Sequence, residues 1–250
     1  MKPPTFADVL AARETIAPFL HRTPLWNHRL LSAQLGAQVW VKHENHHRVG
    51  AFKVRGGMNL VAGLDEGERR RGLICVTRGN HGLSIASAGQ QFGVPVVIVV
   101  PEGNNPEKNA AMQALRAQLV VHGRDFDEAR ERAEQLQAEH GYRYVHSANE
   151  PKLIAGVATY ALEVFEDLPD PDYIFVPVGL GSGICGVCTV ARHHDSTATI
   201  IGVQAERAPA VTRSFRDGRT VCTDSADTFA DGLATRVPAE ATLAIMRQRV

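Results

Sequence analysis

Predicted strands and helices alternate along almost the whole chain, and this alternation constrains the fold more than any other feature. Residues 94–100 form a continuous apolar run rich in valine, which is typical of a strand buried on both faces of a parallel sheet. Other strands are predicted at 39–41, 73–76, 118–121, 142–145, 173–178 and 199–204, and helices at 52–64, 80–92, 106–116, 125–140, 151–166 and 183–193. Such alternation indicates an α/β fold with parallel sheets.

The alternation has two phases, one before and one after about Val145. We therefore expect two α/β lobes with a cleft between them, because ligands bind at the carboxyl ends of parallel strands. Near the end of the chain, residues 215–223 contain the turn sequence Asp217-Gly218, which could join two short strands. Residues 238–250 are predicted to be helical.

Composition excludes several classes of protein. The 250 residues carry 27 basic and 27 acidic side chains, so no electrostatic footprint for nucleic acid or an anionic membrane is present. We find neither the apolar run of a signal peptide nor a segment apolar enough to span a bilayer. Four cysteines do not make a disulfide framework in a chain of this size. We expect a cytoplasmic protein.

Lys53 is the first candidate for chemistry. A lysine amine becomes a nucleophile when desolvation or a neighbouring cation lowers its pKa. Phe52 and Val54 supply apolar flanks, and Arg55 supplies a cation. An ordinary surface lysine on a helix is the alternative. Glycines on both sides of Lys53 instead indicate that another part of the backbone approaches closely.

Residues 177–186, Pro-Val-Gly-Leu-Gly-Ser-Gly-Ile-Cys-Gly, predict a strand, a glycine-rich turn and a helix. This arrangement is typical of phosphate sites. The turn lacks the Gly-Lys-Ser/Thr ending of a nucleotide P-loop and the spacing of a dinucleotide loop, so a single phosphate is favoured over a nucleotide. A purely structural turn is the alternative. A lysine nucleophile combined with a phosphate site suggests pyridoxal 5'-phosphate (PLP), which needs both.

A second polar turn, Thr77-Arg78-Gly79-Asn80-His81-Gly82, follows the predicted strand 73–76. Backbone N–H groups in such a turn can hold a carboxylate. Asn80 could reach a hydroxyl of a cofactor, or it could simply cap the helix that follows. Both interpretations of Asn80 remain open from the residues alone.

Other polar residues favour less specific roles. Cys185 and Cys188 are spaced as in some zinc or redox sites but have no second pair, so small buried apolar residues are favoured. The histidines His43, His46 and His47 lack a matching partner pair and favour solvated or supporting positions over a metal site. Three carboxylates are candidates for a cation site or for positioning roles, with a solvated surface position as the alternative: Glu163, Glu206 and Asp231.

The order and spacing of these segments resemble the fold-type II PLP-dependent enzymes, the tryptophan synthase β-subunit-like superfamily, and within it the threonine/serine dehydratases. The resemblance covers essentially the whole chain. It rests on linked motifs at residues 42–44 (KHE), 50–57 (GAFKVRGG), 77–82 (TRGNHG), 105–109 (NPEKN), 154–163 (IAGVATYALE), 179–182 (GLGS), 202–206 (GVQAE) and 230–234 (ADGLA).

The resemblance implies two parallel-sheet, three-layer αβα domains with PLP in the cleft between them. Residues 1–45 and 146–250 would form the large PLP-binding domain, and residues 46–145 the small domain. The large domain is expected to be C-terminally incomplete, because the family's chain normally continues. The family also implies a homodimer and a monovalent or divalent cation, for which Glu206 is the candidate ligand.

The resemblance also implies the site residues. Lys53 would bind PLP covalently and later abstract the Cα proton, with Phe52 beside the ring and Asn80 hydrogen-bonded to its phenolic oxygen. The phosphate would be held by Gly179, Leu180, Gly181, Ser182 and Gly183, and the substrate by Thr77, Arg78, Gly79, Asn80 and His81. Leu180 and Ser182 replace glycines of the family, which requires a negative φ at both.

The implied reaction is β-elimination, which converts a hydroxy amino acid such as L-threonine or L-serine into a 2-oxo acid and ammonia. Arg78 stands where serine racemases carry a proton-exchanging serine. Arginine stays protonated, so dehydration is predicted over racemisation. Arg78 could also pair with a second carboxylate, which would favour 3-hydroxyaspartate. The alternatives are another fold-type II lyase or a weakly active PLP-binding homologue; a nucleotide-binding module is disfavoured.

Overall fold

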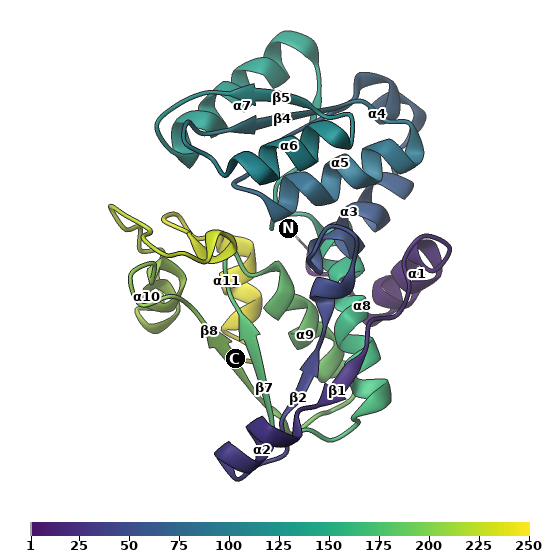
Figure 1. Cartoon of the computed structure of the whole chain (residues 1–250), viewed down its shortest axis with the longest axis vertical. Coiled ribbons are helices and arrows are strands. Elements are labelled where there is room, and N and C mark those ends of the chain that lie inside the picture. The colour runs from purple at the N-terminus through teal and green to yellow at the C-terminus, as the bar shows by residue number, and fades with distance from the viewer. Residues whose placement is uncertain (1) are drawn as a thin grey trace.

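The computed structural model describes residues 2–250 and has the predicted α/β architecture (Figure 1). A four-stranded parallel sheet has the order β5-β4-β3-β6. A second parallel pair joins β7 to β8, and a short antiparallel pair joins β1 to β2. The strands are β1 (Leu25–Asn27), β2 (Trp40–Lys42), β3 (Leu73–Val76), β4 (Val96–Val100), β5 (Gln118–Val121), β6 (Arg143–Tyr144), β7 (Tyr173–Pro177) and β8 (Thr199–Val203).

The four-stranded sheet is the centre of three layers. Residues Ile74 and Val97 pack on one face against α7 (Phe126–His140). Their neighbours Leu73 and Ile98 pack on the other face, in the core that includes α5 (Asn80–Phe92) and α6 (Pro106–Ala114). Every residue of β4 is buried, as predicted for a strand covered on both sides.

The β7–β8 pair is covered by helices on one face. Ile174, Val176 and Ile200 pack in a core with α1 (Phe6–Ile16), α8 (Pro151–Asp167), α9 (Ser182–His193) and α11 (Glu240–Met246). On the other face, the side chains of Tyr173 and Phe175 are exposed. Figure 1 shows this part of the molecule below the four-stranded sheet.

Helix α3 (Lys53–Ala62) lies between α5 and α8 at the junction of the two parts. Glycines allow this close packing. A Cβ atom at Gly57 would lie 2.3 Å from Ser84 Oγ on α5, and one at Gly156 would lie 2.5 Å from the carbonyl oxygen of Arg55 on α3. The predicted close approach is therefore confirmed at Gly56 and Gly57 but is wrong for Gly50, which has φ +67° and no atom within 4 Å of its Cβ position.

The end of the chain differs from the prediction. Residues 215–223 do not form two strands: α10 (Ala210–Arg216) includes Phe215, and Asp217 follows it as the C-cap. Gly218 has φ +70° and begins an irregular loop. The Ser214 hydroxyl accepts a hydrogen bond from the Val221 N–H at 2.8 Å, so the loop is held to the helix and not to a strand. Helix α11 is shorter than the predicted 238–250.

Several short elements were not predicted. They are α2 (Arg29–Leu35), α4 (Glu66–Arg71) and the 3₁₀ turns η1 (Glu44–His46) and η2 (Asp231–Leu233), besides α1, β1 and α10. Within residues 2–250, no helix combines the length and the apolar character needed to cross a membrane.

Candidate active site

A cavity of about 240 Å³ opens where β3 and β7 end, between the four-stranded sheet and the β7–α9 segment. This position agrees with the general placement of ligands at the carboxyl ends of parallel strands. Every residue predicted from the sequence to bind cofactor or substrate lines this cavity: Phe52, Lys53, Thr77, Arg78, Gly79, Asn80, His81, Gly179, Leu180, Gly181, Ser182 and Gly183.

Lys53 is the first residue of α3, and its side chain extends into the cavity. The amine donates hydrogen bonds to Ser182 Oγ at 2.5 Å and to the carbonyl oxygen of Ser147 at 3.1 Å. Burial of the amine lowers the pKa of Lys53 to about 8. A substantial share of the amine is therefore neutral and nucleophilic close to physiological pH.

The glycine-rich turn lies between β7 and α9. Gly181 has φ +100°, a conformation that favours glycine. A Cβ atom at Gly179 would lie 2.3 Å from the carbonyl oxygen of Gly232, and one at Gly183 would lie 3.2 Å from the Phe52 ring. The turn therefore packs closely against Gly232 and the Phe52 ring. The first N–H groups of α9 have no partner within the helix and suit an anion.

The two replaced glycines cause no strain. Among the non-glycine residues in 2–250, only Arg116 and Asp195 have positive φ. Leu180 and Ser182 therefore both have the negative φ that is required of a residue that replaces glycine there. Ser182 is buried and adds a hydroxyl that contacts the lysine amine.

The Thr77–His81 turn forms the opposite wall. The Thr77 hydroxyl accepts hydrogen bonds from the N–H groups of Gly79 at 2.9 Å and Gly82 at 3.2 Å. Burial, aided by the charge of Lys53, lowers the pKa of His81 to about 3. The neutral His81 ring therefore donates its Nε2–H to the carbonyl oxygen of Val145 at 3.0 Å.

Asn80 is the first residue of α5, and Gly79 is the N-cap of that helix. The alternative that Asn80 serves as the helix cap is therefore wrong. The Asn80 side chain lines the cavity. Its Nδ2 atom lies 3.7 Å from the position that a Cβ atom on Gly232 would occupy. Arg78 is half-buried and also lines the cavity.

Two ion pairs near the cavity were not predicted. Lys108 Nζ on α6 lies 2.9 Å from Asp231 Oδ2, and both residues line the cavity. Arg236 Nη1 lies 2.7 Å from Asp125 Oδ2 at the start of α7. The sequence offers no local signal for these pairs, because each joins residues more than a hundred positions apart.

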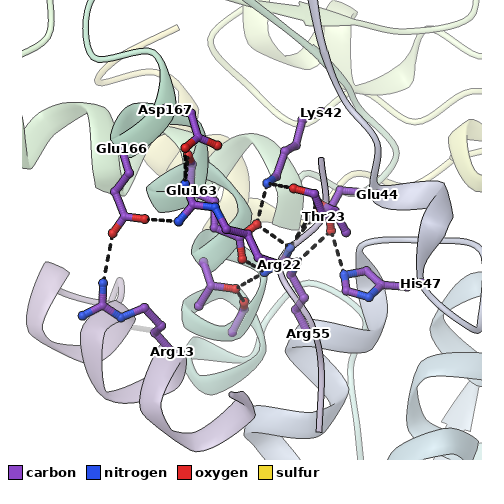
Figure 2. Close-up of polar contacts among 12 residues, drawn as sticks. Arg13, Arg22, Thr23, Lys42, Glu44, His47, Arg55, Glu163, Glu166 and Asp167 are labelled. Atoms are coloured by element: carbon purple, nitrogen blue, oxygen red, sulfur yellow. Dashed lines mark hydrogen bonds and ion pairs between the residues drawn. The ribbon is translucent and has the colours of Figure 1, made fainter. Parts of the chain in front are cut away.

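Glu163 is not a solvated surface carboxylate. It belongs to a buried group of charged side chains with Lys42, Glu44 and Arg55 (Figure 2). We call these four residues the Arg55 cluster. His47 is buried beside it, so one of the three histidines of the predicted loop has a supporting position.

The predicted cation site is not supported. Glu206 is exposed in the turn after β8. In the described part of the chain, no group of three or more His, Cys, Asp or Glu side chains could hold a metal ion. Cys185 and Cys188 are free and buried, and burial raises the pKa of both thiols, as expected for apolar packing residues.

Comparison with known proteins yields relatives along the whole chain. The chain is 38% identical over 246 residues to the L-threonine ammonia-lyase of Thermotoga maritima, covering 98% of this chain and 61% of that protein. It is 37% identical over 247 residues to the L-threo-3-hydroxyaspartate ammonia-lyase of Saccharomyces cerevisiae, covering 99% and 76%. The chain thus spans less than two thirds of the length of the first relative.

A solved structure has the same fold over the whole chain. The structure of maize serine racemase superimposes with a TM-score of 0.95 at 27% identity, covering 100% of this chain and 75% of the racemase. The sequence profile of the family described as "Pyridoxal-phosphate dependent enzyme" matches residues 16–250. This chain therefore belongs to the family of pyridoxal-phosphate dependent enzymes.

Proposed function

We propose that this protein binds PLP through Lys53 and catalyses β-elimination of a hydroxy amino acid, releasing a 2-oxo acid and ammonia. The observation that carries the proposal is the meeting of three features in one cavity. A lysine amine with a lowered pKa, a glycine turn beside the start of α9 and the polar Thr77–His81 turn all line it. Family membership and the ammonia-lyase relatives support the same reaction.

The cavity fits the cofactor that the family implies. The glycine turn ends at the first N–H groups of α9, which suit a phosphate group, and Gly179 and Gly183 place no side chain between the turn and its close neighbours. The Phe52 ring beside Gly183 offers an apolar surface to a pyridine ring. When bound, PLP supplies an electron sink for the charge that develops at the substrate Cα atom.

The residues of the chain supply binding and proton handling. We assign covalent attachment of the cofactor, and then removal of the Cα proton, to the Lys53 amine. Its lowered pKa suits a general base that works close to neutral pH. The backbone N–H groups of the Thr77–His81 turn orient the substrate carboxylate, and Asn80 is assigned to the phenolic oxygen of the cofactor.

Dehydration is favoured over racemisation. A racemase needs a group on the second face of the substrate that gives and takes a proton. We assign that position to Arg78, which lines the cavity, and a guanidinium stays protonated and cannot act as the acid and base that racemisation needs.

The proposal is tested by adding PLP and L-threonine to the purified protein. The expected products are 2-oxobutanoate and ammonia in equal amounts, with D-allo-threonine, the product of inversion at Cα, formed far more slowly. Lys53→Ala is the control and should form neither product. Bound PLP without any 2-oxo acid from L-threonine, L-serine or 3-hydroxyaspartate would refute β-elimination of this substrate class.

A second candidate substrate is 3-hydroxyaspartate. Arg78 lines the cavity and would attract a second carboxylate, whereas Lys108 already pairs with Asp231. The yeast relative carries the name of a 3-hydroxyaspartate ammonia-lyase. Arg78→Ala should then lower kcat/KM for 3-hydroxyaspartate by about 10-fold or more, the effect of one lost charge-assisted contact. An equal loss with L-threonine would argue against this role.

The remaining expectations stay proposals. We propose that residues 46–145 form the small domain and that residues 1–45 and 146–250 form the large one; strands β3 to β6 all fall within the first range. A cytoplasmic homodimer is proposed from the family resemblance, and sedimentation measurements would test the dimer. The cation predicted at Glu206 forms no part of the proposal.

A further inference from the structure

The Arg55 cluster is a set of buried charged side chains linked by hydrogen bonds (Figure 2). The Arg55 side chain is almost fully buried. Its guanidinium donates to Glu44 Oε2 at 2.8 Å and Oε1 at 2.9 Å, and to Glu163 Oε1 at 2.7 Å and Oε2 at 2.9 Å. Lys42 Nζ donates to the second Glu163 oxygen as well. Arg55 thus bridges two carboxylates with both edges of its fork.

The cluster connects three elements to the start of α3. Lys42 ends β2, Glu44 begins η1 and Glu163 lies on α8. Lys53 and Arg55 are two residues apart on α3, and each residue of an α-helix turns by about 100°, so their side chains leave the helix on nearly opposite sides. The cluster therefore holds the first turn of α3 from behind, while Lys53 extends into the cavity.

The charges of the cluster balance. Lys42 and Arg55 are cations, and Glu44 and Glu163 are carboxylates. Burial by itself would raise the pKa of Glu44, but His47, whose Nε2 lies 3.5 Å away, and Arg55 outweigh it and lower that pKa to about 2. A balanced, buried group of charges adds little net stability over well-packed apolar residues, but it fixes the relative positions of the elements that carry it.

We propose that Arg55, Glu44 and Glu163 are positioning residues that set the location of the Lys53 amine in the cavity. This inference rests on the role proposed above for Lys53. The amine keeps its buried position only if the first turn of α3 holds it against Ser182 and Ser147. The proposed effect is on the placement of the amine, and the variants below separate it from an effect of the charges themselves.

The position of the amine can be measured in the protein without cofactor. The rate at which Lys53 reacts with trace acetic anhydride is followed against pH by mass spectrometry of its peptide, and the midpoint of the profile reports the pKa of Lys53. In the wild type we expect a midpoint of about 8. The other titratable groups near this amine are His81 on α5, His146 before α8 and Cys185 on α9.

Two variants separate placement from charge. Arg55→Lys keeps the cation but cannot bridge both carboxylates with one ammonium group. Glu163→Gln removes one negative charge. Placement predicts that the midpoint rises toward ~10.4 in both variants, because water reaches the amine; a rise of about one pH unit would lower the labelling rate at pH 8 about fivefold. Charge alone predicts no change in Arg55→Lys and a fall in Glu163→Gln.

Arg69→Met is the matched control. Arg69 donates to the carbonyl oxygens of Val61, Ala62 and Leu64, at the far end of α3. Its loss should weaken the helix without moving the midpoint of Lys53. An unchanged midpoint in Arg55→Lys, a fall in Glu163→Gln, or an equal rise in Arg69→Met would overturn the proposal.

A milder variant covers the case in which Glu163→Gln does not fold. Thr159→Val removes an acceptor that lies 3.1 Å from Arg55 Nη1 and leaves all charges in place, so a smaller rise is expected. The proposal would be overturned if the midpoint of Lys53 rose neither in Thr159→Val nor in Arg55→Lys. The experiment uses neither PLP nor substrate, so its failure is distinct from a failure to bind cofactor or to eliminate.

Discussion

The two sides of the cavity are held in place by different kinds of contact. The start of α3, which carries Lys53, is fixed by the Arg55 cluster, whose Arg55 and Glu163 side chains are 2% and 11% exposed. Residues 231–236 on the other side are tied to α6 and α7 by Lys108–Asp231 and Arg236–Asp125, whose side chains are 25–40% exposed. Exposed ion pairs contribute about 0–1 kcal/mol each, whereas breaking a buried pair costs roughly 3–5 kcal/mol. We therefore expect the side that carries the proposed nucleophile to be the more rigid of the two and the opposite side to be the more mobile.

The largest expected effect comes from removing the nucleophile on the rigid side. Lys53→Ala should abolish the visible absorption that PLP acquires on binding and lower elimination by about 10³-fold or more, because no other amine takes over covalent attachment. Absorption spectra and 2-oxo acid assays check this. Lys152→Ala serves as the control, since Lys152 donates to the carbonyl oxygen of Gly63 at the other end of α3. Retention of the visible band in Lys53→Ala would contradict the proposed role.

The contrast between the two sides is tested directly by comparing one carboxylate from each. Glu163→Gln should lower the free energy of unfolding by about 3–5 kcal/mol, because it removes the carboxylate that pairs with Lys42 and one of the two buried carboxylates that pair with Arg55. Asp231→Asn should cost less than about 1 kcal/mol, because solvent screens that pair. Urea denaturation of both variants gives the two values. Equal losses would remove the distinction between a rigid and a mobile side.

A smaller effect is expected in the glycine turn. In Gly179→Ala the new methyl group would lie 2.3 Å from the carbonyl oxygen of Gly232, so the turn or residues 231–236 must move. Overpacking of this kind costs about 1–3 kcal/mol, so PLP affinity should fall roughly 5- to 150-fold. Fluorescence titration with PLP measures the affinity. Gly67→Ala on the exposed helix α4 is the control and should bind PLP normally. Unchanged affinity in Gly179→Ala would mean that residues 231–236 move away from the new methyl group at no cost in free energy.

The pH dependence of cofactor capture sharpens the account of the rigid side. Only the neutral amine attacks an aldehyde, and burial lowers the pKa of Lys53 to about 8. The rate of PLP capture should therefore rise about tenfold per pH unit below pH 8 and level off above it. The same shift means that folding stability falls as pH is lowered from ~10.4 to about 8, because the unfolded chain takes up the proton first. Stopped-flow absorbance measures the capture rate, and a midpoint near 10 would show a solvated amine.

The general fold was predictable from the sequence because its signals are local. The valine run at β4 and the polar turns after β3 and β7 identify strand ends directly, and a parallel sheet brings such ends together. The strand pair expected around Asp217 was wrong, because a turn sequence does not reveal whether a partner strand exists. Helices α1 and α4 begin with capping boxes at Thr5–Asp8 and Asp65–Glu68, a local signal that could have identified both.

The supporting contacts of the site could not be predicted in the same way. Glu163 lies 108 positions from Arg55, and Asp231 lies 123 positions from Lys108. The residues next to each of these positions in the sequence do not indicate that the Arg55–Glu163 pair is buried or that the Lys108–Asp231 pair is exposed. These contacts depend on how the two parts of the chain pack, which only the three-dimensional structure describes.

The central claim, that Lys53 carries the cofactor, is tested most directly by reducing the PLP-loaded protein with borohydride and mapping the modified peptide. The chain contains five lysines, at positions 2, 42, 53, 108 and 152, so assignment is unambiguous. We predict that the reduced cofactor is found on Lys53. Modification of Lys42, Lys108 or Lys152 with Lys53 left free would contradict the account.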